Sequence, residues 1–320
     1  MDTTYELKLL VEAFDEPFKK KFETGVLTHI NRSELYFEKA LSDDDEMYFT
    51  DVIYRCNHAY EGVLKEAYSI LFGKDSSKQT PDKIEKDFLS NNVINDRVKN
   101  QFTSYRQDWR NPSTHDYQLF FSKEEAFMAI LSVSSFIYTL LSQLLVSQAY
   151  NKLKNKKNNM AQINGFDFDN IVEKIAVFSL YLKNENIKPA TELQIEGYLL
   201  AYLEWIFPDL SIKSEYRFAG GVADIVIEYQ SNIVCVLEIK KYLEKNYDNA
   251  RLQVSKYVDL LKCKSGIVYL YTDDVDIKYD IVIDELVGYI DNDHKVINVE
   301  ESEINKNIGD TIAIIAPVKA

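Results

Sequence analysis

Two short apolar runs in the second half of the sequence constrain its fold more than any other feature. Residues 222–229 read VADIVIEY, residues 233–240 read IVCVLEIK, and only Gln230, Ser231 and Asn232 separate the two runs. Runs of this length, rich in β-branched residues and joined by a short polar segment, predict a β-hairpin. The flanking sequence must therefore supply a sheet around the hairpin and helices that cover its apolar face.

The pairing within this hairpin follows from its turn. If the loop is centred on Ser231, residues at equal distances from Ser231 face each other, which places Asp224 opposite Glu238. Directly opposed residues have Cβ atoms about 4.5–5.5 Å apart, and the alternation of side chains puts Lys240 on the same face as Glu238. The sequence therefore predicts that two carboxylates and a lysine meet on the polar face of the hairpin.

This group of side chains suits metal-assisted hydrolysis. Two adjacent carboxylates repel each other unless a cation lies between them, and hard oxygen ligands with retained waters favour Mg²⁺, with Mn²⁺ as a substitute. A bound metal lowers the pKa of a water that Lys240 can orient or help to deprotonate, and the same charges stabilise a pentavalent phosphate. The alternative is a surface hairpin in which Glu238 and Lys240 form an ordinary cross-strand ion pair.

The sequence around the hairpin predicts an α/β domain. Residues 192–207 have the pattern of a helix that Thr191 caps, with Gln194 completing a capping box. A second helix is expected over residues 247–262. The further predicted strands are residues 211–218, 266–271, 279–283 and 311–317. Helices and strands in this order favour one mixed sheet.

The first half of the sequence predicts helices only. Residues 49–73 place apolar side chains at helical spacing and end at Gly73, a natural C-cap. Residues 122–148 begin with Ser122 and Glu125, which form a capping-box pattern, and continue apolar for several turns. Two further helices are expected over residues 4–24 and 31–42.

A segment rich in Lys and Asn over residues 148–165 separates the two halves. We therefore expect an α+β protein of two domains. The predicted domains are an all-α bundle over residues 1–157 and an α/β domain with a mixed sheet over residues 158–320.

The charge and the cysteines exclude several classes of protein. A net charge of −14, from 37 basic and 51 acidic residues, excludes a protein that coats nucleic acid with a basic surface. Any polyanion site must then be a local basic pocket or use a metal. No apolar run reaches the roughly 18 residues that span a bilayer, the N-terminus lacks a signal-peptide pattern, and the three cysteines are widely spaced. We expect a reduced, cytoplasmic protein without contact to a membrane.

The motifs of residues 185–272 resemble those of the PD-(D/E)XK nuclease superfamily. Asp224 in GGVADIVIEY and the EIK triplet that ends with Lys240 match the acidic and lysine positions, although Ala223 stands where the name-giving proline would be. The resemblance implies a restriction-endonuclease-like fold and an endonuclease that uses Mg²⁺. It also implies a set of metal ligands, namely Asp224, Glu238, Ile239 and Glu196.

Two helices complete this resemblance. The family usually supplies a Glu from the helix before the sheet; Glu196 heads an E-x-x-L-x-x-x-L pattern, and Glu192 lies one turn earlier on the same face. Gln253 and Tyr257 reproduce the Q-x-x-x-Y helix of RecB-like members. The resemblance implies catalytic roles for all four, with Glu196 ranked before Glu192. A chance polar pair on an amphipathic helix is the alternative for Gln253 and Tyr257.

A second candidate site lies in the first half, where the chain reads RNPSTH from Arg110 to His115 and Pro112 should interrupt any helix. A neutral His can move protons at a ribose 2′-OH, and an Arg can stabilise the phosphorane, so these residues suit metal-free cleavage of RNA. A capped loop whose Arg and His bind backbone carbonyls is the alternative. The R-x4-6-H pattern within residues 49–148 resembles a HEPN domain. That resemblance implies a homodimer through the helical domain and catalytic roles for Arg110, Asn111 and His115.

Three functions remain open at this point. The first is Mg²⁺-dependent cleavage of DNA or RNA at the C-terminal site, and the second is metal-independent cleavage of RNA at Arg110 and His115. The third is a regulatory binding module without turnover. Both families are frequent in bacterial systems that attack nucleic acid, which by analogy suggests an effector of anti-phage or abortive-infection defence.

Overall fold

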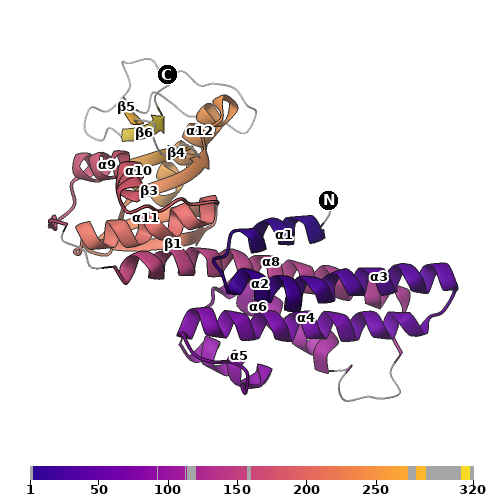
Figure 1. The fold of residues 1–320 in the computed structure, drawn as a ribbon. Helices are drawn as coiled ribbons and strands as arrows, with labels where there is room; N and C mark the ends of the chain where they lie inside the picture. The colour runs from indigo at the N-terminus through magenta and orange to yellow at the C-terminus, as the bar shows by residue number, and fades with distance from the viewer. Residues whose placement is uncertain are drawn as a thin grey trace. The chain divides into compact units, whose positions relative to one another are not determined.

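The computed structural model describes residues 3–91, 93–111, 113, 120–156, 160–272, 279–285 and 311–317. The chain divides into two compact units, Met1–Gln148 and Ala149–Ala320 (Figure 1). The first unit is helical and the second combines helices with a mixed sheet, so the protein is of the mixed α and β class, as expected. The division falls closer to the N-terminus than residue 157. The reason is that Tyr150 and Lys154, at the end of a long helix, both donate hydrogen bonds to Glu204 of the second unit.

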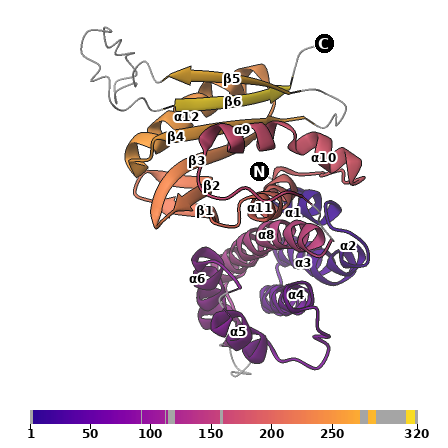
Figure 2. The same cartoon turned by 90° about the vertical axis from the view of Figure 1, so that its left-hand side faces the viewer.

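The first unit consists of helices packed around aromatic side chains. Its elements are α1 (Thr3–Glu12), α2 (Phe18–Lys21), the π-helix η1 (Phe22–Leu27), α3 (Thr28–Asp43), α4 (Met47–Phe72), α5 (Pro81–Ser90), α6 (Asp96–Tyr105), the π-helix η2 (Arg106–Arg110) and α8 (Lys123–Lys154), whose residues from Ala149 onward belong to the second unit. Tyr60 on α4 lies at the centre of the core. Its ring is 4.7 Å from that of Tyr105 and 5.2 Å from that of Phe136. Helices α3 and α4 lie side by side (Figures 1 and 2).

The predicted helix ends in this unit are confirmed where a capping residue marks them. Gly73 follows α4 with φ +63°, in the left-handed region that a glycine adopts without strain. The backbone N–H of Ser122 donates to Glu125, and the backbone N–H of Glu125 donates to the Ser122 hydroxyl, which is the capping box. The single helix expected over residues 4–24 is wrong, because α1 ends at Glu12 and Pro17 precedes α2.

Helix α8 is long and apolar, although serine, threonine and glutamine residues interrupt its apolar runs. Among the described residues it is the one helix long and apolar enough, by length and composition, to cross a membrane. In its most apolar window 61% of the residues are buried inside the protein. Core helices of soluble proteins share this property, so the finding does not decide where the protein resides.

The second unit is built on a sheet with helices on both faces. Its elements are α9 (Phe168–Ala176), α10 (Phe178–Asn184), α11 (Glu192–Ile206), β1 (Ser211–Phe218), β2 (Gly221–Tyr229), β3 (Asn232–Lys241), α12 (Glu244–Leu261), β4 (Ser265–Tyr271), β5 (Tyr279–Glu285) and β6 (Thr311–Pro317). The strand order is β1-β2-β3-β4-β6-β5. Strands β3 and β4 are parallel and α12 connects them, whereas β1, β2 and β3 form an antiparallel meander. Figure 2 shows α12 behind the sheet and α9 in front of it.

The hairpin of β2 and β3 has the predicted register near its open end but a different turn. Gln230 and Ser231 both have positive φ and form a two-residue loop, so Tyr229 pairs with Asn232. A bulge then shifts the register, because Glu228 pairs with Ile233 while Ile227 pairs with Cys235. The shorter turn and the extra residue compensate each other. The pairing of Ile225 with Leu237 is therefore the one that a turn centred on Ser231 predicts.

Candidate functional site

The end of the β2–β3 hairpin brings Asp224, Glu238 and Lys240 into direct contact. The backbone N–H of Asp224 donates to Glu238 Oε1 at 3.3 Å, and the backbone N–H of Ile239 donates to Asp224 Oδ2 at 2.7 Å. Lys240 Nζ lies 3.2 Å from Asp224 Oδ2 and 3.1 Å from Glu238 Oε2, and it also donates to the Ile239 carbonyl at 3.0 Å. Both carboxylates are thus fixed by backbone donors as well as by the ammonium.

The burial of Glu238 distinguishes this group from a surface ion pair. Its side chain is 0% exposed, whereas those of Asp224 and Lys240 are 25% and 28% exposed. The polar face of the hairpin is therefore not a solvated surface, because helices cover it. Asp224 and Lys240 lie at the side of the site that is open to solvent, and Glu238 lies at its buried end.

Helix α12 contributes Gln253 and Tyr257 to the same site. Gln253 Nε2 donates to Glu238 Oε2 at 2.9 Å and to the Tyr257 hydroxyl at 3.1 Å. Tyr257 in turn packs edge-on against Phe218 of β1, with ring centroids 4.9 Å apart. The side chain of Gln253 therefore has a fixed orientation, and the pair is part of the cluster and not a chance polar pair on an outer helix face.

Helix α11 places two further carboxylates beside the hairpin. Thr191 caps this helix, because its side chain accepts a hydrogen bond from the backbone N–H of Gln194. Glu192 Oε1 lies 3.5 Å from Lys240 Nζ. Glu196, one turn further, is 6% exposed, and its Oε1 is buried without a hydrogen-bond partner. Of the two glutamates, Glu192 contacts the lysine and Glu196 offers an unused acceptor.

Glu215 is a fifth carboxylate near the site, and sequence reasoning missed it. It lies on β1 between Ser214, which pairs with Ile225, and Tyr216, which pairs with Ala223. Its φ of +46° is unusual for a residue with a side chain inside a strand. Its charge contributes to the raised pKa of Glu196. The signal that could have found it is the register of β1 and β2, which places Glu215 opposite Asp224.

The pKa values of three glutamates of the cluster and of Lys240 are all raised, for different physical reasons. Burial, followed by the charge of Asp224, raises the pKa of Glu238 to about 7. The same two causes, in the same order, raise the pKa of Glu196 well above its ordinary value. Burial also raises the pKa of Glu192, while Lys240 opposes that change. For Lys240 burial lowers the pKa, but the charges of Asp224 and Glu238 outweigh it and the net shift is upward.

The donor set of this cluster fits a hard divalent cation by its chemistry. The candidate ligands are carboxylate oxygens and the Ile239 carbonyl, which are the donors that Mg²⁺ and Mn²⁺ prefer. The unpartnered Oε1 of Glu196 is a buried acceptor that a cation would satisfy. Among the described residues no three acidic, histidine or cysteine side chains already converge as metal ligands. Lys240 Nζ instead lies between Asp224, Glu238 and Glu192.

Only part of the second candidate site lies within the described residues. Arg110 ends η2, and its guanidinium lies 3.5 Å from Glu61 Oε1 and 3.4 Å from Asn111 Oδ1. Asn111 and Ser113 are themselves helical, so the expected interruption of the helix at this point is not found on either side of residue 112. His115 and Pro112 lie outside the described residues, and the proposed pairing of Arg110 with His115 stays a prediction.

A polar network attaches this segment to α4. Asn57 Nδ2 donates to the Ser113 hydroxyl at 2.7 Å, and the Tyr105 hydroxyl donates to Asn57 Oδ1 at 3.0 Å. The Ser113 hydroxyl donates to the carbonyl of Arg110 at 3.1 Å. These hydrogen bonds hold the backbone next to Arg110 in place.

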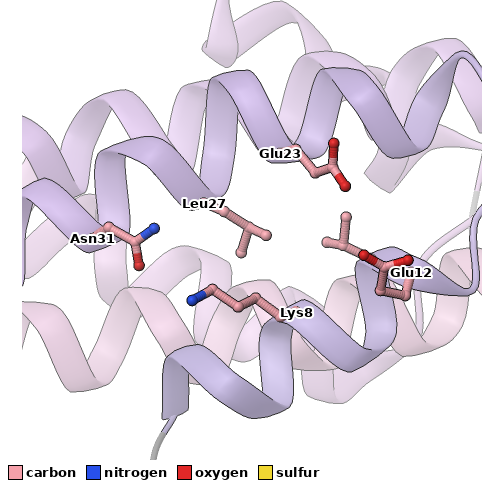
Figure 3. A pocket seen from close by; sticks show the side chains of 6 residues that line it. Lys8, Glu12, Glu23, Leu27 and Asn31 are labelled. Atoms are coloured by element: carbon pink, nitrogen blue, oxygen red, sulfur yellow. The ribbon is translucent and has the colours of Figure 1, made fainter.

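A hollow between α1, η1 and α3 shows no comparable arrangement of buried charged groups. Figure 3 shows Lys8 and Glu12 from α1 opposite Glu23 and Leu27 from η1, with Asn31 of α3 at one end. Its charged groups are of both signs, and none of their side chains is buried. We therefore place the candidate active site at the β2–β3 hairpin and not in this hollow.

Comparison of the chain with protein-family models, with curated proteins and with solved structures found no match.

Proposed function

We propose that the second unit is a divalent-metal-dependent nuclease that cleaves phosphodiester bonds of DNA or RNA at the Asp224–Glu238–Lys240 cluster. The observation that carries the proposal is the burial of Glu238, which is 0% exposed and contacts Lys240, Gln253 and the backbone of Asp224. A buried carboxylate costs folding free energy through desolvation. An opening that keeps several buried carboxylates together is therefore typical of an active site.

The residues take distinct roles in this proposal. Mg²⁺, when bound by Asp224, Glu238, the Ile239 carbonyl and Glu196, supplies Lewis-acid activation of a water and of the phosphate. Lys240 keeps its proton, because its net pKa shift is upward, so it acts as a cation that orients the water or stabilises charge on the phosphorane. Gln253 holds Glu238 in position through the 2.9 Å hydrogen bond.

The experiment that tests this proposal is a cleavage assay on the full chain with labelled DNA and RNA, with Mg²⁺ or with EDTA. We expect cleavage that requires the metal and is lost in Asp224→Asn. Glu228→Gln is the matched control, because Glu228 lies on the same hairpin but pairs with Lys213 away from the cluster. Cleavage that Asp224→Asn leaves intact would contradict the proposal.

A second candidate activity is metal-independent cleavage of RNA at Arg110, Asn111 and His115 in a HEPN-like homodimer. It is favoured by the hydrogen bonds that fix the backbone at Arg110 and by the contact of its guanidinium with Glu61. The test is RNA cleavage in EDTA, which Arg110→Ala and His115→Ala should both abolish. Residual RNA cleavage in either variant would contradict a composite site of Arg and His.

The wider setting of the protein follows only by analogy. A nuclease that joins two such activities would suit a cytoplasmic effector of anti-phage or abortive-infection defence. Expression of the wild-type chain in bacteria should then restrict phage growth or slow host growth, and Asp224→Asn should relieve the effect.

A further inference from the structure

A face of the first unit formed by α3 and α4 gathers cations and aromatic rings. The two helices lie side by side (Figures 1 and 2). Residues on α3 at intervals of three or four positions share one side of the helix, and α4 supplies partners for them. The α3–α4 basic face consists of His29, Arg32, Tyr36, Lys39, Tyr48, Arg55 and His58.

Direct contacts join most of these side chains into one surface. The guanidinium of Arg55 lies 5.6 Å from the centre of the Tyr36 ring, and Tyr36 stacks on Tyr48 with centroids 5.9 Å apart and planes at 18°. Lys39 Nζ lies 5.8 Å from the centre of the Tyr48 ring. At the other end His29 stacks on His58 with ring centroids 5.0 Å apart. Cationic and aromatic groups therefore alternate along the two helices.

The three arginine and lysine side chains of this face form no ion pair among the described residues. Arg32, Lys39 and Arg55 differ in this from Lys83 and Lys86 on α5, which pair with Asp87 and Asp82. Burial and then the positive charges of His58, Arg55 and Arg32 lower the pKa of His29. The charges that shift the pKa of His29 are therefore all positive, although the chain has a net charge of −14.

We propose that the α3–α4 basic face binds single-stranded nucleic acid. Phosphates would contact Arg32, Lys39 and Arg55, and bases would stack against the aromatic and guanidinium planes between them. From His29 to Lys39 the face extends about 15 Å along α3, which suits a few nucleotides of one strand. This site goes beyond the proposed nuclease centre and does not depend on it, because all its residues lie in the first unit.

The test is fluorescence anisotropy of the full chain with labelled single strands of RNA and of DNA, about 20 nucleotides long, and with a duplex, all in EDTA. We expect Arg32→Gln/Lys39→Gln/Arg55→Gln to bind either single strand at least about tenfold more weakly than wild type. Its log-log dependence of affinity on salt should be shallower by about two, since each lost phosphate contact removes about 0.7. Asp51→Asn, which removes an exposed acid of α4 between Tyr48 and Arg55, should bind more tightly.

The matched control is Lys83→Gln/Lys86→Gln/Lys99→Gln, which removes the same charge from α5 and α6 of the same unit. It should bind like wild type. Equal loss in the control and in the triple variant of the face would overturn the proposal, and so would tighter binding of the duplex. A variant that binds nucleic acid normally but changes the molar mass in light scattering would show an interface between copies, which also contradicts it. If the triple variant melts early, Arg55→Gln and Asp51→Asn provide the same comparison.

Discussion

The replacement Glu238→Gln should change how the stability of the protein depends on pH. The pKa of Glu238 in the folded protein is about 7, against an ordinary value of 4.5, because the side chain is buried beside Asp224. Between these two pH values the folded protein binds a proton that the unfolded chain has released, so the free energy of unfolding falls as pH rises. One unit of pKa corresponds to about 1.36 kcal/mol, and the full shift therefore amounts to about 3 kcal/mol.

The assay is urea unfolding at a series of pH values between pH 4.5 and about pH 7 in EDTA, followed by circular dichroism. The free energy of unfolding should fall across this interval by up to about 3 kcal/mol more in wild type than in Glu238→Gln, whatever the absolute stability of the variant. Glu228→Gln, on the same hairpin but outside the cluster and paired with Lys213, should run parallel to wild type. Adding Mn²⁺ to wild type should flatten its curve, because a cation favours the ionised carboxylate. Parallel curves for wild type and Glu238→Gln would refute the reasoning.

Three further predictions concern helix caps, packing and the buried acid of α11. Thr191→Ala should lower the free energy of unfolding by about 1 kcal/mol, because the backbone N–H of Gln194 loses its acceptor; urea unfolding measures it, and a change below about 0.3 kcal/mol would contradict it. Gly266→Ala should lower the free energy of unfolding by about 1–3 kcal/mol in the same assay, since the new Cβ would lie 2.3 Å from Val254 Cγ1 of α12. An unchanged midpoint of urea unfolding would contradict this tight contact between β4 and α12. Glu196→Gln should raise the melting temperature above pH 7, because an amide has no charge to desolvate, yet weaken Mn²⁺ binding in calorimetry; a lower melting temperature would contradict this view.

The hairpin shows how far sequence reasoning reaches and where it stops. Alternation and a short polar segment were enough to predict that Asp224, Glu238 and Lys240 lie together. The two-residue turn and the bulge opposite it were not predictable, because Gln230 and Ser231 are not residues that usually mark left-handed turns. The prediction of the register near Asp224 held because these two departures cancel.

Some features of the candidate site depend on tertiary contacts that patterns in the sequence do not reveal. Glu192 and Glu196 lie on one side of α11 at a spacing of one turn, so no local pattern could tell which contacts Lys240 and which stays buried without a partner. The complete burial of Glu238 depends on α12, which a reading of the hairpin alone does not include. Glu215 was missed because finding it requires the register between β1 and β2, which the hairpin of β2 and β3 does not define.

The account depends most on Lys240 acting in the chemical step, and a single-turnover cleavage assay with Mg²⁺ tests this directly. Lys213→Ala is the matched control, because Lys213 lies on β1 of the same sheet and pairs with Glu228. A surface ion pair contributes only about 0–1 kcal/mol, whereas a group that stabilises the transition state contributes about 10²–10³ in rate. We predict that Lys240→Ala binds Mn²⁺ at least as well as wild type and cleaves about 10²–10³-fold more slowly, while Lys213→Ala cleaves normally. Retention of more than about a third of the wild-type rate in Lys240→Ala would contradict the assignment of Asp224, Glu238 and Lys240 as one active site.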